Sequence, residues 1–176
     1  MKIVIASAFI LNLATCASTD FTTDVSLSAE NVARLMAVND NLIVPGERIG
    51  PIFIGMTETQ LYQKLGNPSK TVRGKDGTWI AYEYGSLGLS SQVDPATHKV
   101  NVVDNYSFFG DHKTVLYYTR EGIKAGSSEL QVQTLPWTLL WKRQDRLSAQ
   151  YWRFQYTGIR INTCEGTVCG ITVFAP

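Results

Sequence analysis

The chain has 176 residues, of which 44% are hydrophobic, 18% charged and 11% aromatic. This composition is typical of a folded globular protein and excludes a disordered or fibrous one. The formal net charge is +1, which leaves no broad positive surface for nucleic acid, so we expect no nucleic-acid partner. The length suits one domain or two small ones.

The first 15 residues have the pattern of an export signal. Met1 and Lys2 give a positive start, and residues 3–13 are almost wholly apolar. A run of this length is too short to cross a bilayer, which takes about 20 residues, but it suits the core of a signal peptide. We therefore predict a signal peptide over residues 1–15.

The end of this leader, Leu-Ala-Thr-Cys at residues 13–16, resembles the processing site of a bacterial lipoprotein. The resemblance implies that Cys16 is lipidated, although Thr15 stands where such sites prefer Gly, Ala or Ser. Because Ala17 and Ser18 follow without an Asp, it also implies an anchor at the periplasmic face of the outer membrane. The alternative is an ordinary secretory leader cut near Ala17, giving a soluble periplasmic or secreted protein.

Two short segments separate the leader from the main fold. Residues 16–27 are small and polar and are predicted to be a tether from lipid to fold. Residues 28–44 are predicted to hold a helix over 28–38, followed by a linker, because apolar residues recur there at helical spacing. The alternative for this helix is a disordered continuation of the tether.

Two further cysteines, Cys164 and Cys169, flank a predicted turn at Glu165-Gly166 with β-rich runs on both sides. Cysteines placed in this way can face one another, so we predict a disulfide that staples a hairpin. Zinc is the alternative, but two cysteines without another Cys or His nearby make a poor site, and no metal or cofactor is expected.

The chain also repeats itself. A short strand, a glycine and the capping-box pattern Thr-x-x-Gln in residues 49–68 recur in residues 122–137, with Ser in place of Thr. The matching pairs, all 71 residues apart, are Ile52 with Ile123, Gly55 with Gly126, Thr57 with Ser128, Glu58 with Glu129, and Gln60 with Gln131. Aromatic strands follow at residues 79–84 and 151–156. A fixed period indicates duplicated units.

This repeat predicts a first module over residues 45–110 and a second over 111–176. Each module reads as a short helix followed by strands that are joined by short turns. Strands in that order pair antiparallel and place the helix on one face. The sequence therefore predicts an α+β fold of two tandem modules, each a short helix packed on a three- to four-stranded antiparallel sheet.

The first module resembles a known family of small exported α+β modules. Its Gly-Met-Thr at residues 55–57 and Leu-Gly-x-Pro at 65–68 are shared by the β-lactamase inhibitory protein and by the small lipoprotein of the outer-membrane β-barrel assembly machine. The second module departs from the motif, with Ser127 in place of the Met and residues 135–137 in place of the Leu-Gly-x-Pro. A tandem most resembles the inhibitory protein, which implies joined sheets with a concave protein-binding face.

No catalytic motif is recognised in the sequence, and we expect no enzyme activity. His98 and His112 lie in predicted turns and are expected to be solvated. Asp104 and Asp111 flank the segment between the modules and could form a carboxylate pair. Two solvated acids at the tip of a linker are the preferred interpretation.

Binding has more support, because the aromatic strands have two distinct faces. Alternation places Trp152, Phe154 and Tyr156 on the face expected to meet the helices, and Tyr151 and Arg153 on the other. The same register in the first module buries Ile80, Tyr82 and Tyr84. Trp141 stands in a basic segment and is expected to be displayed there; the alternative is that Trp141 is buried in the core of the second module. Since Tyr, Trp and Arg are enriched at binding hot spots, the predicted partner-binding residues are Trp79, Glu83, Trp141, Tyr151 and Arg153.

The two halves also differ in charge. Residues 17–110 hold 7 basic and 10 acidic residues, a net of −3, whereas residues 111–176 hold 8 and 5, a net of +3. Opposed charges can steer a partner. We therefore expect an exported lipoprotein that binds a protein of the periplasm or envelope, as inhibitor or immunity protein of a periplasmic enzyme or toxin. The alternative is a structural or accessory lipoprotein of an envelope assembly or secretion complex.

Overall fold

The computed structural model describes residues 27–105, 117–135, 138–144 and 150–176, with only the backbone described at 138–144 and 150–152. The helices are α1 (Ala29–Ala37), α2 (Glu58–Leu65), α3 (Glu129–Gln133) and the 3-10 helix η1 (Gly85–Leu87). No helix within the described part of the chain is long and apolar enough to cross a membrane. The predicted signal peptide, with Cys16 after it, lies outside the described residues.

The larger of two sheets contains both modules. Its strands are β4 (Lys70–Arg73), β5 (Ile80–Tyr84), β6 (Leu89–Asp94), β7 (Lys99–Asn105), β9 (Thr138–Gln144), β10 (Gln150–Tyr156), β11 (Ile159–Cys164) and β12 (Thr167–Phe174). They lie in the order β4-β5-β6-β7-β12-β11-β10-β9 and every neighbouring pair is antiparallel. The predicted α+β fold is confirmed, and pairing of β7 with β12 joins the two module sheets into one.

The smaller sheet has the order β3-β2-β1-β8. Its strands are β1 (Leu42–Val44), β2 (Arg48–Ile49), β3 (Ile52–Phe53) and β8 (Tyr118–Thr119). Strands β1 and β8 pair in parallel, which links the segment before the first repeat to the start of the second. Arg48 is buried in this sheet and donates to Asp40 Oδ1 at 2.7 Å and to the Gly50 carbonyl at 3.1 Å. The hydrogen bond from Arg48 lowers the pKa of Asp40.

The internal repeat is visible in the backbone hydrogen bonds. In each module the glycine before the helix has φ +82° and donates to the last strand, and the first helical residue donates to the turn that precedes that strand. The bonds are Gly55 N to Val100 O at 2.7 Å and Glu58 N to His98 O at 3.0 Å, then Gly126 N to Val168 O at 2.9 Å and Glu129 N to Gly166 O at 2.8 Å. Each helix start is therefore clamped to the edge of its own hairpin.

Helix α2 begins at the predicted capping box. The Thr57 hydroxyl accepts from the Gln60 backbone N–H at 3.2 Å, and the Gln60 side chain accepts from the Thr57 N–H at 2.8 Å. In the second module the Ser128 hydroxyl accepts from the Gln131 N–H at 3.2 Å. These bonds satisfy N–H groups that a helix start leaves without partners.

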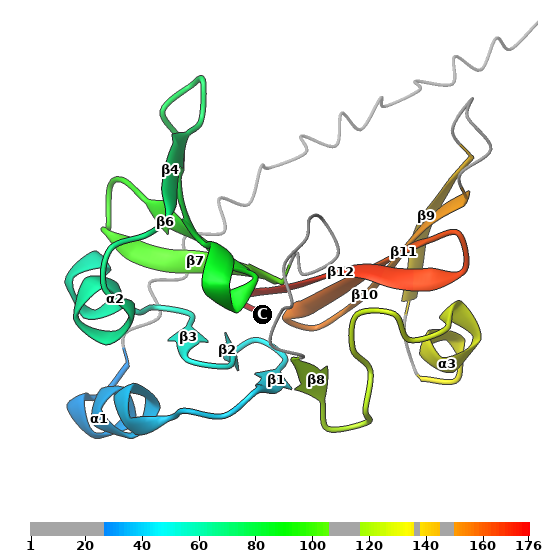
Figure 1. Cartoon of the computed structure of the whole chain (residues 1–176), viewed down its shortest axis with the longest axis horizontal. Helices are drawn as coiled ribbons and strands as arrows, with labels where there is room; N and C mark the ends of the chain where they lie inside the picture. The colour runs from blue at the N-terminus through cyan, green and yellow to red at the C-terminus, as the bar shows by residue number, and fades with distance from the viewer. Residues whose placement is uncertain (1–26, 106–116, 136–137, 145–149) are drawn as a thin grey trace, which may run out of the picture.

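One face of the large sheet packs against the helices, and we call it the inner face. Residues in register across it are Tyr84, Leu89, Asn105, Ile171, Ile161 and Phe154, all of them buried. Figure 1 shows α1, α2, α3 and the small sheet on this side of the large sheet. The two outermost strands, β4 and β9, point away from the helices. The burial predicted for Ile80, Tyr82 and Tyr84 is confirmed.

The burial predicted for Tyr156 is wrong, because its side chain is 51% exposed. Tyr156 is the last residue of β10, next to the turn into β11. Phe154, two residues earlier on the same face, is 4% exposed. Helix α3 is bonded to the sheet at Thr163, which pairs with Trp152 near the other end of β10, so the helix lies away from Tyr156.

Helix α1 confirms the helix predicted before the first module. The Ser28 hydroxyl accepts from the Asn31 N–H at 3.3 Å at its start, and Leu35 is buried. At its end, the Lys64 ammonium of α2 donates to the carbonyls of Leu35, Met36 and Val38 at 3.0, 2.7 and 2.7 Å. A cation there satisfies carbonyls that the end of a helix leaves open, so it fastens α1 to α2.

The predicted disulfide between Cys164 and Cys169 is present, with the two Cα atoms 5.7 Å apart. It joins β11 to β12 beside their turn, where Cys164 pairs with Thr167 in register. The register shifts between Asn162 and Thr163, which pair with Gly170 and Val168. Cys169 is therefore the extra residue of a β-bulge, and the disulfide closes the bulged hairpin.

Candidate functional site

The face of the large sheet opposite the helices, which we call the outer face, carries a continuous row of polar side chains. In register from β4 to β10 the row is Lys70, Glu83, Ser90, Asp104, Thr172, Arg160 and Gln155. Six of these residues, all but Lys70, are next in sequence to a residue of the buried inner row, and Lys70 pairs in register with Glu83. Because successive residues of a strand point to opposite faces, the row lies on the outer face. Thr172, in the middle of the row, is buried, and the other six residues keep some solvent exposure, so the row gives a polar surface that water or a polar partner can reach.

Neighbours in this row hold one another by charge and hydrogen bonds. The Lys70 ammonium lies 3.4 Å from Glu83 Oε1. At the junction of the modules the Thr172 hydroxyl donates to Asp104 Oδ1 at 2.7 Å. Asp104 belongs to the first module and Thr172 to the second, so this bond crosses the pairing of β7 with β12.

Asp104 was expected to be a solvated acid at the tip of a linker, but the structure places it within a strand. It lies in β7 and is partly buried at the centre of the large sheet. Burial raises the pKa of Asp104, while the Thr172 hydroxyl and the charge of Arg160 act in the opposite direction. Asp111, its proposed companion, lies outside the described residues.

Arg160 and Arg153 lie on neighbouring strands of this face. The Arg160 guanidinium lies over the Phe174 ring, 5.4 Å from its centroid, and its Nε is buried without a hydrogen-bond partner among the described residues. Burial lowers the pKa of Arg160, and the charge of Arg153 lowers it further. Arg153 Nε donates to Asn162 Oδ1 at 3.3 Å.

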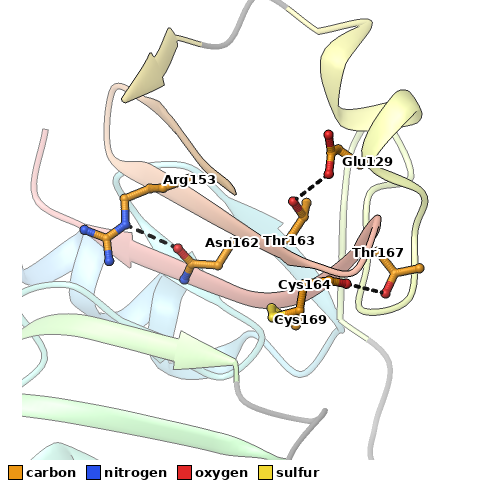
Figure 2. The surroundings of a disulfide bond; sticks show 7 residues. All are labelled: Glu129, Arg153, Asn162, Thr163, Cys164, Thr167 and Cys169. Atoms are coloured by element: carbon orange, nitrogen blue, oxygen red, sulfur yellow. Dashed lines mark hydrogen bonds between the residues drawn. A yellow bond between two sulfur atoms is a disulfide. The ribbon is translucent and has the colours of Figure 1, made fainter. Parts of the chain in front are cut away.

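Figure 2 shows this part of the sheet, with Arg153 reaching Asn162 on one side of β11. The next residue, Thr163, points the opposite way and donates to Glu129 of α3 at 3.1 Å. The disulfide lies beside Asn162 at the end of the same hairpin. Arg153 therefore belongs to the outer face and Thr163 to the inner face.

The predicted partner-binding residues have different surroundings. Trp79 is partly buried against the turn between β4 and β5, where a Cβ added at Gly74 would lie 2.8 Å from Trp79 Nε1. Glu83 is engaged by Lys70. Trp141 pairs in register with Arg153, and Tyr151 pairs with Cys164, but the side chains of Trp141 and Tyr151 lie outside the description.

The structure does not bring these residues into one cluster. Glu83 in β5 and Arg153 in β10 are separated by five strand spacings, or about 24 Å at the usual distance between strands. Asp104, Thr172 and Arg160 occupy the middle of that span. None of these three was among the predicted partner-binding residues, although each stands next to a buried β-branched residue in its strand.

A second cluster lies at the start of α2, in a pocket of about 320 Å³ lined by Thr57, Glu58, Thr59, Tyr62, Thr97 and His98. Glu58 accepts a hydrogen bond from the Tyr82 hydroxyl, and His98 Nδ1 lies 3.3 Å from Glu58 Oε2. His98 occupies the predicted turn, with φ +55° and a 68% exposed side chain. His112 lies outside the described residues.

The repeat indicates that Glu58 has a structural role. Its counterpart Glu129 accepts from Thr163 of β11 at 3.1 Å, so in both modules the first acid of the helix ties the helix to the sheet. Gly166 takes the hydrogen-bonding place of His98 there. An exposed imidazole beside a carboxylate could exchange a proton, but the tie between helix and strand works in the second module without it.

Metal-binding chemistry finds no support in the described ranges, where no three His, Cys, Asp or Glu side chains gather as potential ligands. The polar row instead offers guanidinium, ammonium, hydroxyl and amide groups as hydrogen-bond donors, and the carboxylates of Glu83 and Asp104 as acceptors. Such a set is suited to recognising polar and charged groups of another molecule.

No family model and no curated protein matches this chain. Three solved structures are similar to part of this chain. An extracellular protein containing a SCP domain from Bacillus anthracis has 11% identity and a TM-score of 0.43, covering 69% of this chain and 44% of its own. A DUF4309 family protein from Bacillus subtilis has 10% identity and a TM-score of 0.41, covering 68% and 78%.

The third is a cysteine-rich secretory protein from Staphylococcus aureus, with 13% identity, a TM-score of 0.44, and coverage of 80% of this chain and 48% of its own. This chain thus spans less than half the length of the first and third structures. The resemblance to the β-lactamase inhibitory protein and the barrel-assembly lipoprotein stays a prediction.

Proposed function

We propose that this protein is exported and binds another protein through the outer face of its large sheet, as an inhibitor or immunity protein of a periplasmic enzyme or toxin. The observation that carries the proposal is the polar row from Lys70 to Gln155, which runs across seven paired strands and both modules. A surface built on a hydrogen-bonded sheet is held in place before a partner arrives, which reduces the entropy lost on binding.

The size of this face suits a protein partner. Eight strands at the usual spacing are about 34 Å wide, which accommodates the roughly 800 Å² that a standard interface buries on each side. The central hydrogen bond between Asp104 and Thr172 ties the two modules together under such a partner. Arg153 and Arg160 supply a residue type that is enriched at hot spots.

The proposal includes a lipid anchor at Cys16, carried by the lipoprotein-like leader. If the anchor exists, the wild-type protein fractionates with membranes and a Cys16→Ser variant does not. Retention of Cys16→Ser on membranes would contradict the anchor while leaving the binding face untested by that assay.

Co-purification from gently solubilised membranes tests the binding role. An inhibitor or immunity protein is expected to recover one soluble enzyme or toxin in a one-to-one complex, whose activity it reduces. Recovery of a multi-protein envelope complex that is damaged when this protein is deleted would instead support the alternative role as an assembly component. Failure to recover any protein that depends on the outer face would overturn both.

A further inference from the structure

We propose that the pocket at the start of α2 binds a primary ammonium group on an aliphatic chain, with the Glu58 carboxylate as its counter-ion. The pocket has a volume of about 320 Å³, at the lower end of the range for small-molecule sites. Helix α2 packs on the inner side of the large sheet, so this inference goes beyond the function proposed for the outer face.

The Glu58 carboxylate is held in place and remains accessible. Its Oε1 accepts from the Tyr82 hydroxyl of β5, and burial raises the pKa of Tyr82, so this hydroxyl keeps its proton and donates. Oε2 lies 3.3 Å from His98 Nδ1, and the Glu58 side chain is 28% exposed. Because a carboxylate has about four lone-pair sites, Oε2 can accept a further hydrogen bond from a ligand.

The charge of the lining favours a cation. Of the six described residues that line the pocket, only Glu58 carries a formal charge when the imidazole of His98 is neutral. Lys99 follows His98 in the chain, but it pairs in register with Asp94 and does not line the pocket. A ligand with one positive charge therefore meets an opposite charge in this pocket.

An anion finds few donors here, although the start of a helix commonly attracts one. The backbone N–H groups of Glu58 and Leu61 already donate to the carbonyls of His98 and Thr57 at 3.0 and 2.9 Å. The N–H of Gln60 donates to the Thr57 hydroxyl at 3.2 Å. The negative group at this helix start is the Glu58 carboxylate itself, so a second anion would be repelled.

The other walls suit an ammonium group with an aliphatic stem. Thr59 of α2 and Thr97 of the turn between β6 and β7 are exposed, and hydroxyl oxygens can accept from an ammonium group. The Tyr62 ring is held edge-to-face against Tyr82, with the ring centroids 5.7 Å apart. An aromatic ring in the wall offers both apolar contact for methylene groups and cation–π attraction.

The second module shows which of these side chains the fold itself needs. There Glu129 is the counterpart of Glu58 and ties α3 to Thr163, and Gly166 takes the place of His98. His98 has φ +55°, a conformation that glycine adopts more readily than an imidazole-bearing residue. The fold therefore accepts glycine at this position, which indicates that the imidazole serves the pocket and not the turn.

Matched ligands test the site. We would titrate the full mature chain at pH 8 and low salt with n-butylamine and n-butanol, and with Ac-Gly-Lys-Gly-NH2 and the same peptide acetylated on the lysine. Methyl phosphate and N-acetylglucosamine represent anionic and neutral polar ligands. The methyl signals of Thr59 and Thr97, which line the pocket, are followed by NMR.

Each ammonium ligand is expected to shift both methyl signals saturably and to bind at least ten-fold more tightly than its uncharged counterpart. Tighter binding of the lysine peptide than of n-butylamine would assign the ammonium group to a protein, and equal binding would assign it to a small amine. Both results support the site.

Variants show whether Glu58 is responsible. Glu58→Gln keeps an oxygen acceptor for the Tyr82 hydroxyl but removes the charge, so it should weaken both ammonium ligands at least ten-fold. Glu129→Gln is the matched control, because Glu129 has the same place at the start of α3, and it should change binding less than two-fold. His98→Gly, which installs the residue of the second module, should weaken binding at least three-fold.

Two further variants separate this site from the outer face. Arg73→Gln removes a charge at an exposed position in register with the inner-face residue Ile80, and Arg160→Gln alters the outer face. Both should bind the ammonium ligands as wild type does. A chain that binds these ligands but no protein on its outer face overturns the proposed function alone, and the reverse result overturns this inference alone.

Three results would overturn the inference. They are equal binding of charged and uncharged counterparts, tighter binding of methyl phosphate or N-acetylglucosamine than of the amines, and unchanged binding by folded Glu58→Gln or His98→Gly. Thermal midpoints identify the folded variants. If Glu58→Gln does not fold, the comparison of charged and uncharged ligands on wild type still decides the question.

Discussion

Removing the disulfide should lower the free energy of unfolding by about 2 kcal/mol. Cys164 and Cys169 are 5 positions apart, so the bond closes a loop of about six residues. A loop of that length removes about 7 cal/mol/K of entropy from the unfolded chain, or about 2 kcal/mol at 25 °C. For a chain of this size the thermal midpoint of Cys164→Ala/Cys169→Ala should fall by about 4–8 °C.

The effect should also be local, because the stapled hairpin holds the start of α3. The turn accepts from Glu129 N through the Gly166 carbonyl at 2.8 Å, and Val168 O accepts from Gly126 N at 2.9 Å. Hydrogen exchange at Gly126 and Glu129 should accelerate in the variant under native conditions. The equivalent amides of the first module, Gly55 and Glu58, provide an internal control and should change much less.

Urea unfolding followed by circular dichroism gives the global value, and exchange measured by NMR gives the local one. A loss below about 0.5 kcal/mol would refute the entropic reasoning of the cross-link. Equal acceleration in the two modules would show that the hairpin is not a separate local constraint on α3.

Three further changes test the fold and the centre of the outer face. Thr57→Ala should cost about 1 kcal/mol in urea unfolding, because it removes the hydroxyl that accepts from the Gln60 backbone N–H at the start of α2; an unchanged midpoint would contradict this. Lys64→Met removes the three hydrogen bonds that the ammonium donates to carbonyls at the end of α1, and it should lower the free energy of unfolding by about 1–3 kcal/mol. Hydrogen exchange should accelerate most in α1 and not in α3. Burial raises the pKa of Asp104 above the ordinary range of an aspartate, so ionisation of Asp104 costs stability as the pH rises from the ordinary pKa through the raised one. Asp104→Asn, which keeps an acceptor for Thr172, should therefore gain stability relative to wild type as the pH rises through this range, and an equal pH dependence of the two proteins would contradict the shift.

The local features of this fold could be predicted from the sequence. Capping residues, a glycine before each helix and alternating apolar residues act within a few positions of the chain, so they give the starts of α2 and α3 and the buried side of β5. The disulfide was also predictable, because a short turn between two cysteines brings their Cα atoms close. The duplicated clamp at Gly55 and Gly126 follows from the 71-residue repeat.

Contacts between distant segments could not be predicted in this way. The burial of Asp104 depends on Thr172, 68 positions later in the chain, and nothing local indicates that β7 and β12 become neighbours. The exposure of Tyr156 likewise depends on which end of β10 helix α3 lies against, and that is set by the bond of Glu129 to Thr163, 34 positions later in the chain. The strand pattern predicted that the Trp79 side chain is exposed, but the turn at Gly74 packs against the indole ring and partly buries it.

The central claim is that the outer face binds a protein, and its most direct test compares recovery of one protein by three forms of the chain. These are wild type, the outer-face variant Arg153→Ala/Arg160→Gln and the control Arg73→Gln, each purified from gently solubilised membranes and measured by quantitative mass spectrometry. We predict one protein at equal yield with wild type and Arg73→Gln, and at least ten-fold less with the outer-face variant at an unchanged thermal midpoint. Equal recovery by all three forms would contradict the claim.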